Sequence, residues 1–152
     1  MRIALYQPEI PPNTGTILRL AACLSVAVDI IGPVGFDMSD RALRRAGLDY
    51  VQHAELAQYV SWERYVLLRP PGRLVLLTTT GTVSHLDFSY LSDDILLLGR
   101  ESAGVPAPVH AAADARLRVP MRAGLRSLNI AVTAAIVLGE ALRQTGGFAA
   151  FG

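Results

Sequence analysis

Short, almost wholly apolar runs alternate along the chain with stretches whose apolar residues recur every three or four positions. The second pattern is typical of amphipathic helices, and the first is typical of strands that are buried on both faces. We expect strands at Arg2–Gln7, Val26–Ile31, Val51–Leu56, Leu74–Thr79, Ile95–Leu98 and Ala115–Val119. The alternation predicts an α/β fold in which a mostly parallel sheet is covered by helices.

Capping residues and prolines set the expected helix boundaries. Prolines at positions 8, 11 and 12 break both helix and central strand, so the first helix is expected to begin after them. Ser39 and Ser127 are candidate N-caps, and Gly47 is a candidate helix stop. We expect helices from Asn13 or Thr14, over Asp40–Ala46, over Ser61–Leu68, and from Ser127 to about Gln144.

The composition is that of one folded domain. The chain has 152 residues, of which 51% are hydrophobic and 18% charged, so we expect a single domain over residues 1–152. Cys23 is the only cysteine, which favours a reducing compartment and a buried, structural thiol. No run approaches the roughly 18 apolar residues of a membrane span, and no signal-peptide pattern opens the chain. We therefore expect a cytoplasmic protein with no membrane association.

The net charge of +1 makes no global case for nucleic-acid binding, but the basic residues are unusual because all fourteen are arginine. Arginine suits phosphate recognition, although a GC-rich coding sequence produces the same bias. The segment from Arg100 to Arg126 contains five arginines and two acidic residues, which gives it a local charge of +3. Arg41, Arg44 and Arg45 would share one helix face, a pattern that is most often simply solvated.

Several common site types lack their sequence patterns. The chain has no glycine fingerprint of dinucleotide binding, no phosphate-binding P-loop and no G-x-S-x-G serine elbow. The three histidines, His53, His85 and His110, are scattered singly, so no metal site is expected.

Three polar loops remain, each following an apolar strand: residues 13–19, 99–104 and 122–129. Ligands in open parallel sheets bind outside the carboxyl ends of strands, so these loops are expected to converge on one crevice. Glycine-rich loops suit a ligand bound by main-chain groups, while arginines suit a phosphodiester. The candidate polar side chains are Asn13, Arg19, Glu101, Arg126, Ser127 and Asn129.

The same loops carry a family resemblance. Asn13–Arg19, Leu97–Pro106, and Val119–Met121 with Leu125–Ala131 resemble, in order and spacing, the three motifs of the SPOUT class of RNA ribose 2′-O-methyltransferases. Leu43–Tyr50 and Pro8–Gly15 resemble more narrowly the small tRNA wobble-position enzymes of that class. Thr16 and the Ala131–Val132 pair depart from the pattern, which leaves substrate detail open more than reaction type.

The resemblance implies a C-terminal trefoil knot, a homodimer, S-adenosylmethionine as methyl donor and the tRNA anticodon arm as substrate. The implied activity is methylation of the ribose 2′-hydroxyl of nucleotide 34, a cytidine or a carboxymethylaminomethyl-type uridine, in leucine tRNAs. The implied donor-binding residues are Leu77, Gly99, Val119, Met121, Ser127 and Leu128. The implied catalytic residues are Asn13, Arg19, Glu101, Ser127 and Asn129, and the implied RNA-binding residues are Arg19, Arg44, Arg45 and Arg126.

Other interpretations stay open at this point. The enzyme could act on another tRNA or rRNA ribose, or the chain could be a nucleotide- or RNA-binding α/β module without catalysis. Single residues also have simpler roles: Asn13 and Ser127 as helix N-caps, Glu101 as an anion held by loop amides, and Asn129 as a surface polar residue.

Overall fold

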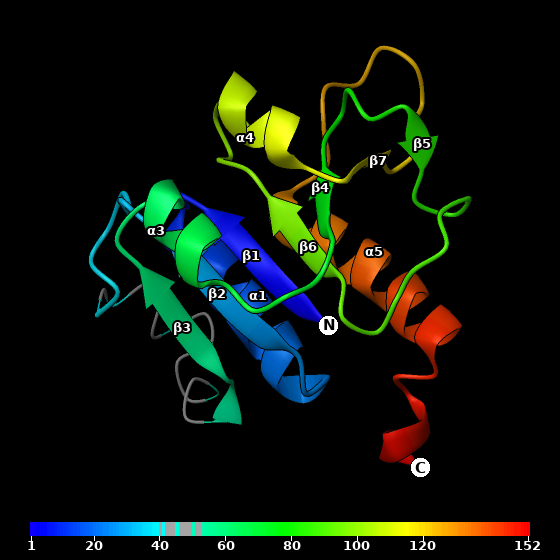
Figure 1. Ribbon diagram of the computed structural model, residues 1–152, viewed down its shortest axis with the longest axis horizontal. Helices are drawn as coiled ribbons and strands as arrows, with labels where there is room; N and C mark the ends of the chain where they lie inside the picture. The colour runs from blue at the N-terminus through cyan, green and yellow to red at the C-terminus, as the bar shows by residue number, and fades with distance from the viewer. Residues whose placement is uncertain (40, 42–44, 46–49, 51–52) are drawn as a thin grey trace.

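The computed structural model describes residues 1–39, 41, 45, 50 and 53–152 (Figure 1). Its centre is one seven-stranded sheet in the order β3-β2-β1-β6-β4-β7-β5, and each pair of neighbouring strands is parallel. The expected parallel α/β sheet is therefore confirmed. The strands are β1 (Arg2–Tyr6), β2 (Ala27–Ile31), β3 (Leu56–Tyr59), β4 (Leu74–Leu77), β5 (Val83–Ser84), β6 (Ile95–Leu98) and β7 (Ala115–Arg118).

Helices cover both faces of the sheet, as Figure 1 shows. The helices α1 (Pro11–Cys23) and α5 (Ile130–Thr145) contact each other and share one apolar core with the sheet. The shorter helices α3 (Trp62–Leu68) and α4 (Ala107–Ala112) contribute to a second core. A short 3₁₀ helix, Ala149–Phe151, ends the chain. Burial on both faces explains why β1, β4 and β6 are almost uninterrupted apolar runs.

Two helix starts differ from the sequence prediction. Helix α1 begins at Pro11 rather than at Asn13 or Thr14, because the first helical positions do not use their N–H groups within the helix and so accept proline. Helix α5 begins at Ile130 rather than Ser127, with Asn129 as its N-cap. The helix predicted after Ser61 is confirmed, since the Ser61 side chain accepts the Arg64 amide.

The strand boundaries also needed correction. The strand predicted at Val51–Leu56 is β3, which begins only at Leu56, where pairing with β2 starts. Strand β4 stops at Leu77, because the threonines after it form a turn. Two further elements, β5 and α4, were not predicted, since they have only two and six residues. Most of the predicted helix over residues 40–46 lies outside the described residues.

Two buried aspartates bind arginines on neighbouring segments. Asp29 and Asp94 are fully buried, and each accepts two hydrogen bonds from one arginine, Arg2 and Arg73 respectively. The hydrogen bonds to the Asp94 carboxylate raise the pKa of Arg73. Cys23, expected to be buried, is exposed at the end of α1. None of the described helices is long and apolar enough to span a membrane.

Candidate active site

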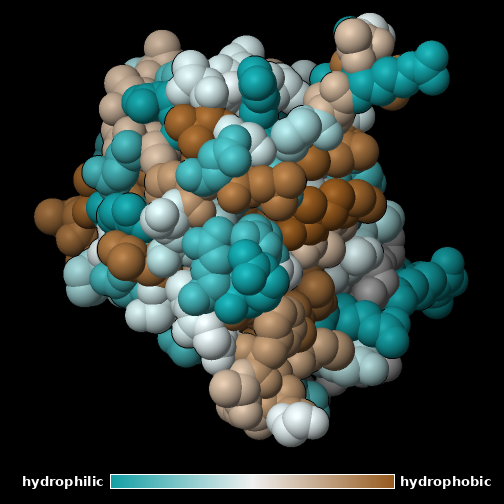
Figure 2. Space-filling model, turned by 90° about the vertical axis from the view of Figure 1, so that its right-hand side faces the viewer, coloured by the Kyte–Doolittle hydropathy of each residue, from teal (hydrophilic) through white to brown (hydrophobic). Residues whose placement is uncertain are grey.

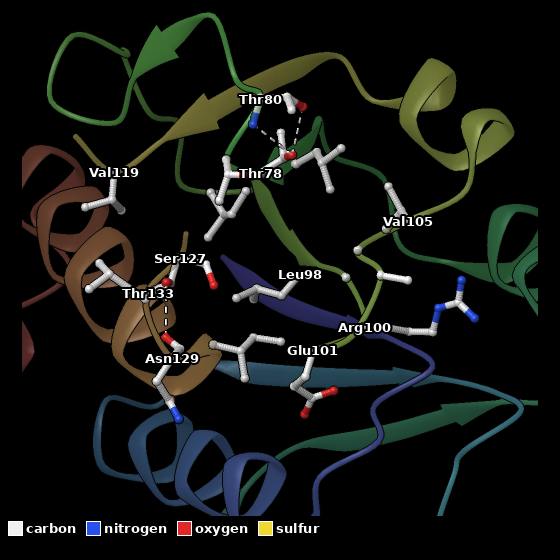
Figure 3. A pocket seen from close by; sticks show the side chains of 18 of the residues that line it. Thr78, Thr80, Leu98, Arg100, Glu101, Val105, Val119, Ser127, Asn129 and Thr133 are labelled. Carbon is white, nitrogen blue, oxygen red and sulfur yellow. Dashed lines mark hydrogen bonds between the residues drawn. The ribbon is translucent and has the colours of Figure 1, made fainter. Parts of the chain in front are cut away.

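A cavity of about 660 Å³ opens at the carboxyl edge of the sheet. It is lined by the chain after β4, the loop after β6 and the segment between β7 and α5. In Figure 3, Thr78, Leu98 and Val119 surround the hollow, whereas the Arg100 side chain points away from it. The structure thus brings together the predicted donor-binding set, Leu77, Gly99, Val119, Met121, Ser127 and Leu128, along with Asn13, Glu101, Arg126 and Asn129.

The loop over residues 99–104 is folded tightly on itself. Arg100 and Gly104 exchange two main-chain hydrogen bonds of 2.9 Å, and Gly104 has φ of +61°. A Cβ atom at Gly99 would lie 2.5 Å from the carbonyl carbon of Gly104. Gly99 was expected to permit close approach of a ligand, but the group that approaches it is the loop's own backbone. The cavity wall at this point therefore consists of main chain without a side chain.

Glu101 is held by the main chain in front of α1. Its carboxylate accepts the amides of Glu9 at 3.0 Å and Ile10 at 3.3 Å. Ile10 is the N-cap position of α1 and supplies no side-chain hydrogen bond, and the first turn of α1 has no acidic residue. Glu101 thus places its negative charge at the positive end of α1 from a distant loop. This geometry matches the simpler role considered for Glu101, an anion held by loop amides.

Two asparagines connect the starts of α1 and α5. The Asn129 Oδ1 atom accepts the amides of Ala131 at 2.8 Å and Val132 at 3.3 Å, so Asn129 caps α5. Its Nδ2 atom donates to Asn13 Oδ1 at 2.9 Å. Asn13 lies within α1 and is not its N-cap, and Ser127 is no N-cap either but an exposed residue of the cavity rim.

The arginines expected to bind RNA lie in different parts of the molecule. Arg126 lines the cavity, whereas Arg19 does not. The Arg19 guanidinium lies over the Tyr50 ring, 4.9 Å from its centre, on the exposed side of α1. Arg45 is exposed, and Arg44 lies outside the described residues. One chain alone therefore does not bring Arg19 to the cavity that holds the other candidates.

The sequence profile of the SpoU rRNA Methylase family matches residues 1–139. The chain belongs to this family. A Beijerinckia indica protein named tRNA (cytidine(34)-2′-O)-methyltransferase is 55% identical, over 97% of this chain and 93% of its own. An Escherichia coli K12 protein of the same name is 41% identical, over 96% of this chain and 94% of its own.

Solved structures agree with this family assignment. A structure described as giving insight into the 2-OH methylation of C/U34 on tRNA has a TM-score of 0.89 and 38% identity, over 94% of both chains. The SpoU methyltransferase AviRb of Streptomyces viridochromogenes, in complex with AdoMet, has a TM-score of 0.83 and 26% identity. That match covers 95% of this chain but 60% of AviRb.

The cavity of this SpoU-family chain fits a nucleoside-sized ligand. Its volume lies within the usual range of small-molecule sites, and Leu98, Val119 and Leu128 give it apolar walls. Polar groups lie between these walls: the hydroxyls of Thr78 and Thr80, 3.1 Å apart, and the exposed Ser127. A site of this kind can enclose an adenine base and still hydrogen-bond a polar tail.

Sequence reasoning missed the threonines of residues 78–80, all of which line the cavity. The signal was present, because a polar run directly follows the apolar β4 and so lies at the ligand-binding edge of the sheet. His110 also lines the cavity, and its Nδ1 atom accepts from Arg116 at 3.1 Å. Within the described part of the chain, no three His, Cys, Asp or Glu residues are grouped as metal ligands.

Proposed function

We propose that this protein methylates the ribose 2′-hydroxyl of nucleotide 34 in tRNA, with S-adenosylmethionine as donor. The observation that carries the proposal is the near full-length similarity, in both directions, to relatives named for this reaction at cytidine 34. The AdoMet complex of AviRb and the cavity described above support the donor. We extend the substrate to a modified uridine at position 34 and to leucine tRNAs, as the motif resemblance implies.

Members of the family named as rRNA methyltransferases offer the main rival substrate. This chain spans 55% of the AdoMet-bound rRNA methyltransferase from Sinorhizobium meliloti but 93% of the Beijerinckia protein. The similarity to proteins of its own length favours the tRNA reaction.

Alignment is the main task of the site, because a ribose hydroxyl is a weak nucleophile at neutral pH. The bound donor supplies an electrophilic methyl group. A guanidinium is too weak a base to take the proton, so we assign Arg19 to holding the neighbouring phosphate and stabilising the negative charge that develops on the 2′-oxygen. Asn13, Ser127 and Asn129 position the ribose at the rim of the cavity.

The proton of the 2′-hydroxyl goes to solvent in this proposal. A carboxylate such as Glu101 is the alternative acceptor, but both of its oxygens accept main-chain amides. We therefore assign Glu101 to holding the loop over residues 99–104. The exposed Arg45 and Arg126, with Arg44, bind the phosphates of the anticodon arm.

A homodimer completes the proposed site, because Arg19 lies outside the cavity of its own chain. Helix α5 exposes two apolar residues one turn apart, Val132 at 47% and Ile136 at 39%. Figure 2 shows apolar side chains gathered over the side of the molecule that carries α5. We propose that a second copy covers this face. Leu138 and Leu142, on the same helix, are buried within the chain and are not part of this contact.

The proposed trefoil knot is consistent with the strand order. Strand β7 pairs between β4 and β5, both of which precede it in the sequence, and the chain then returns to pack α5 against α1. We further propose that residues 1–152 form a single catalytic domain, and that it acts in the cytoplasm on mature or maturing tRNA.

Mass spectrometry of tRNA nucleosides tests the proposed function directly. Purified tRNA from cells with and without the gene is digested, and 2′-O-methylcytidine and 2′-O-methylated modified uridine are quantified at position 34. We expect both to disappear without the gene and to return when purified protein and S-adenosylmethionine are added. If methylation at position 34 is unchanged and an rRNA methyl group is lost without the gene, the substrate is rRNA and not tRNA.

A further inference from the structure

Four hydrogen bonds join the chain before α1 to the tip of the loop over residues 99–104. The amides of Glu9 and Ile10 donate to the Glu101 carboxylate. In the opposite direction, the Glu9 carboxylate accepts the Ser102 amide at 3.0 Å and the Ser102 hydroxyl at 2.8 Å. Each segment thus presents a carboxylate to the main chain of the other, and we call this arrangement the crossed carboxylates.

Neither Glu9 nor Ser102 is among the catalytic or binding residues named so far. Hydrogen bonds from Ser102 lower the pKa of Glu9, and the Arg100 charge acts in the same direction. Glu9 is therefore ionised at neutral pH, and its bonds to Ser102 are charge-assisted. Bonds of this kind fix direction as well as distance, so Ser102 is held in one orientation.

The two segments belong to different parts of the site. Ser102 lines the cavity, within the same loop as Gly99. Ile10 lies directly before α1, the helix that carries Asn13 and Arg19. A rigid connection at this point makes the wall of the donor cavity and the start of the acceptor-side helix move together.

We propose that Glu9 is a positioning residue, which sets the loop over residues 99–104 for donor binding and holds α1 in register with it. This inference rests on the proposed function for its ligand. Glu9 does not line the cavity and acts through Ser102. Glu101 holds the main chain of residues 9 and 10, whereas Glu9 holds Ser102, so the two halves of the crossed carboxylates fix different residues.

The first test uses S-adenosylmethionine binding by calorimetry together with turnover at saturating donor. We expect Glu9→Ala to weaken donor binding roughly tenfold, the scale of one charge-assisted hydrogen bond, and to lower turnover as well. The donor affinity of Glu9→Gln should lie between those of wild type and Glu9→Ala, because one amide oxygen replaces two carboxylate oxygens. Ser102→Ala should have a smaller effect, and the double variant Glu9→Ala/Ser102→Ala should bind no worse than Glu9→Ala. Glu55→Ala removes an exposed carboxylate far from the cavity and serves as the control.

A second test needs no donor. Hydrogen exchange in the ligand-free protein should become faster in Glu9→Ala both at residues 99–104 and at the start of α1, while Glu55→Ala stays like wild type. Unchanged exchange, or donor affinity and turnover equal to wild type, would overturn the role of Glu9. A lower melting temperature with unchanged affinity and turnover would also overturn it, since that is the result of a purely structural contact. If the wild-type protein fails to bind S-adenosylmethionine, the proposed function is contradicted. The exchange measurement then still decides whether Glu9 connects the loop over residues 99–104 to the start of α1.

Discussion

At the scale of single residues, Arg19 is the side chain whose chemistry is easiest to isolate. Lysine keeps its positive charge but loses the planar pair of donors, so Arg19→Lys separates charge from geometry. We expect turnover to fall on the order of 10²-fold, because a misaligned reactant loses about that much, while donor affinity stays within about twofold. Single-turnover methyl transfer to tRNA and calorimetry give the two numbers. Arg64→Lys, at an exposed position of α3, is the matched control. If Arg19→Lys turns over as fast as wild type, the assignment of Arg19 to the acceptor site is wrong.

Gly99 tests whether the shape of the 99–104 loop decides donor binding. A methyl group at this position would lie 2.5 Å from the Gly104 backbone, so Gly99→Ala must push the two sides of the loop apart. We expect donor affinity to fall more than about tenfold and stability to fall by about 1–3 kcal/mol, the usual cost of overpacking. Gly147→Ala is the control, because its added Cβ would also lie 2.5 Å from a neighbouring atom, the Leu142 Cδ2 atom, at a residue that does not line the cavity. Calorimetry and urea unfolding measure both effects, and unchanged affinity would show that this loop does not shape the donor site.

At the scale of elements, Asn129 combines a cap with a link between two helices. Asn129→Ala loses both, and we expect it to cost about 1 kcal/mol of stability for the cap alone. Asn129→Asp keeps an acceptor for the α5 amides but has no donor for Asn13. It should therefore keep wild-type stability in urea unfolding and still show reduced turnover. Equal turnover in wild type and Asn129→Asp would mean that the hydrogen bond donated by Asn129 has no part in the reaction, since Asn13 can turn its amide to donate to the new carboxylate.

The elements also show why sequence reasoning succeeded where it did. The strands β1, β4 and β6 are buried on both faces, so their apolar runs alone identified them. The convergence of three loops followed from parallel strands, since their carboxyl ends share one edge. The anchoring of the chain before α1 was missed because the carboxylate that holds it, Glu101, lies 92 residues from Glu9, beyond any local pattern. Strand β5, with two residues, is too short to show a period of its own.

Individual site residues were harder to predict than the site itself. Motif resemblance located Ser127 and Asn129 at the cavity, but only the geometry distinguishes the helix cap, Asn129, from the exposed rim residue, Ser127. Arg19 shows a second limit, because in the proposed dimer it would reach the cavity of the second copy and not that of its own chain. Such a contact leaves no trace in the local sequence pattern.

At the scale of the whole molecule, the exposed face of α5 predicts the oligomeric state. Ile136→Glu places a charge in the middle of the proposed contact, and desolvating it without a partner is unfavourable. We expect this variant to be a folded monomer with no methyl transfer, while wild type sediments as a dimer. Leu67→Glu, on α3 at a residue that is 70% exposed, should remain a dimer and serves as the control. Sedimentation equilibrium distinguishes these outcomes, and an active wild-type monomer would contradict the dimer.

The late position of β7 in the chain has a consequence for synthesis. Translation delivers β1, α1, β2 and β3 first, and these can pair as they leave the ribosome. The cavity, however, needs residues that follow β7, including Val119 and Leu128. A nascent chain that has folded its first half thus has no complete pocket, and the last pairing to form is one between segments far apart in sequence, which is a slow step. Ligand-binding competence therefore arises only when the ribosome has nearly finished, so a prematurely terminated product does not compete with the finished enzyme for its donor.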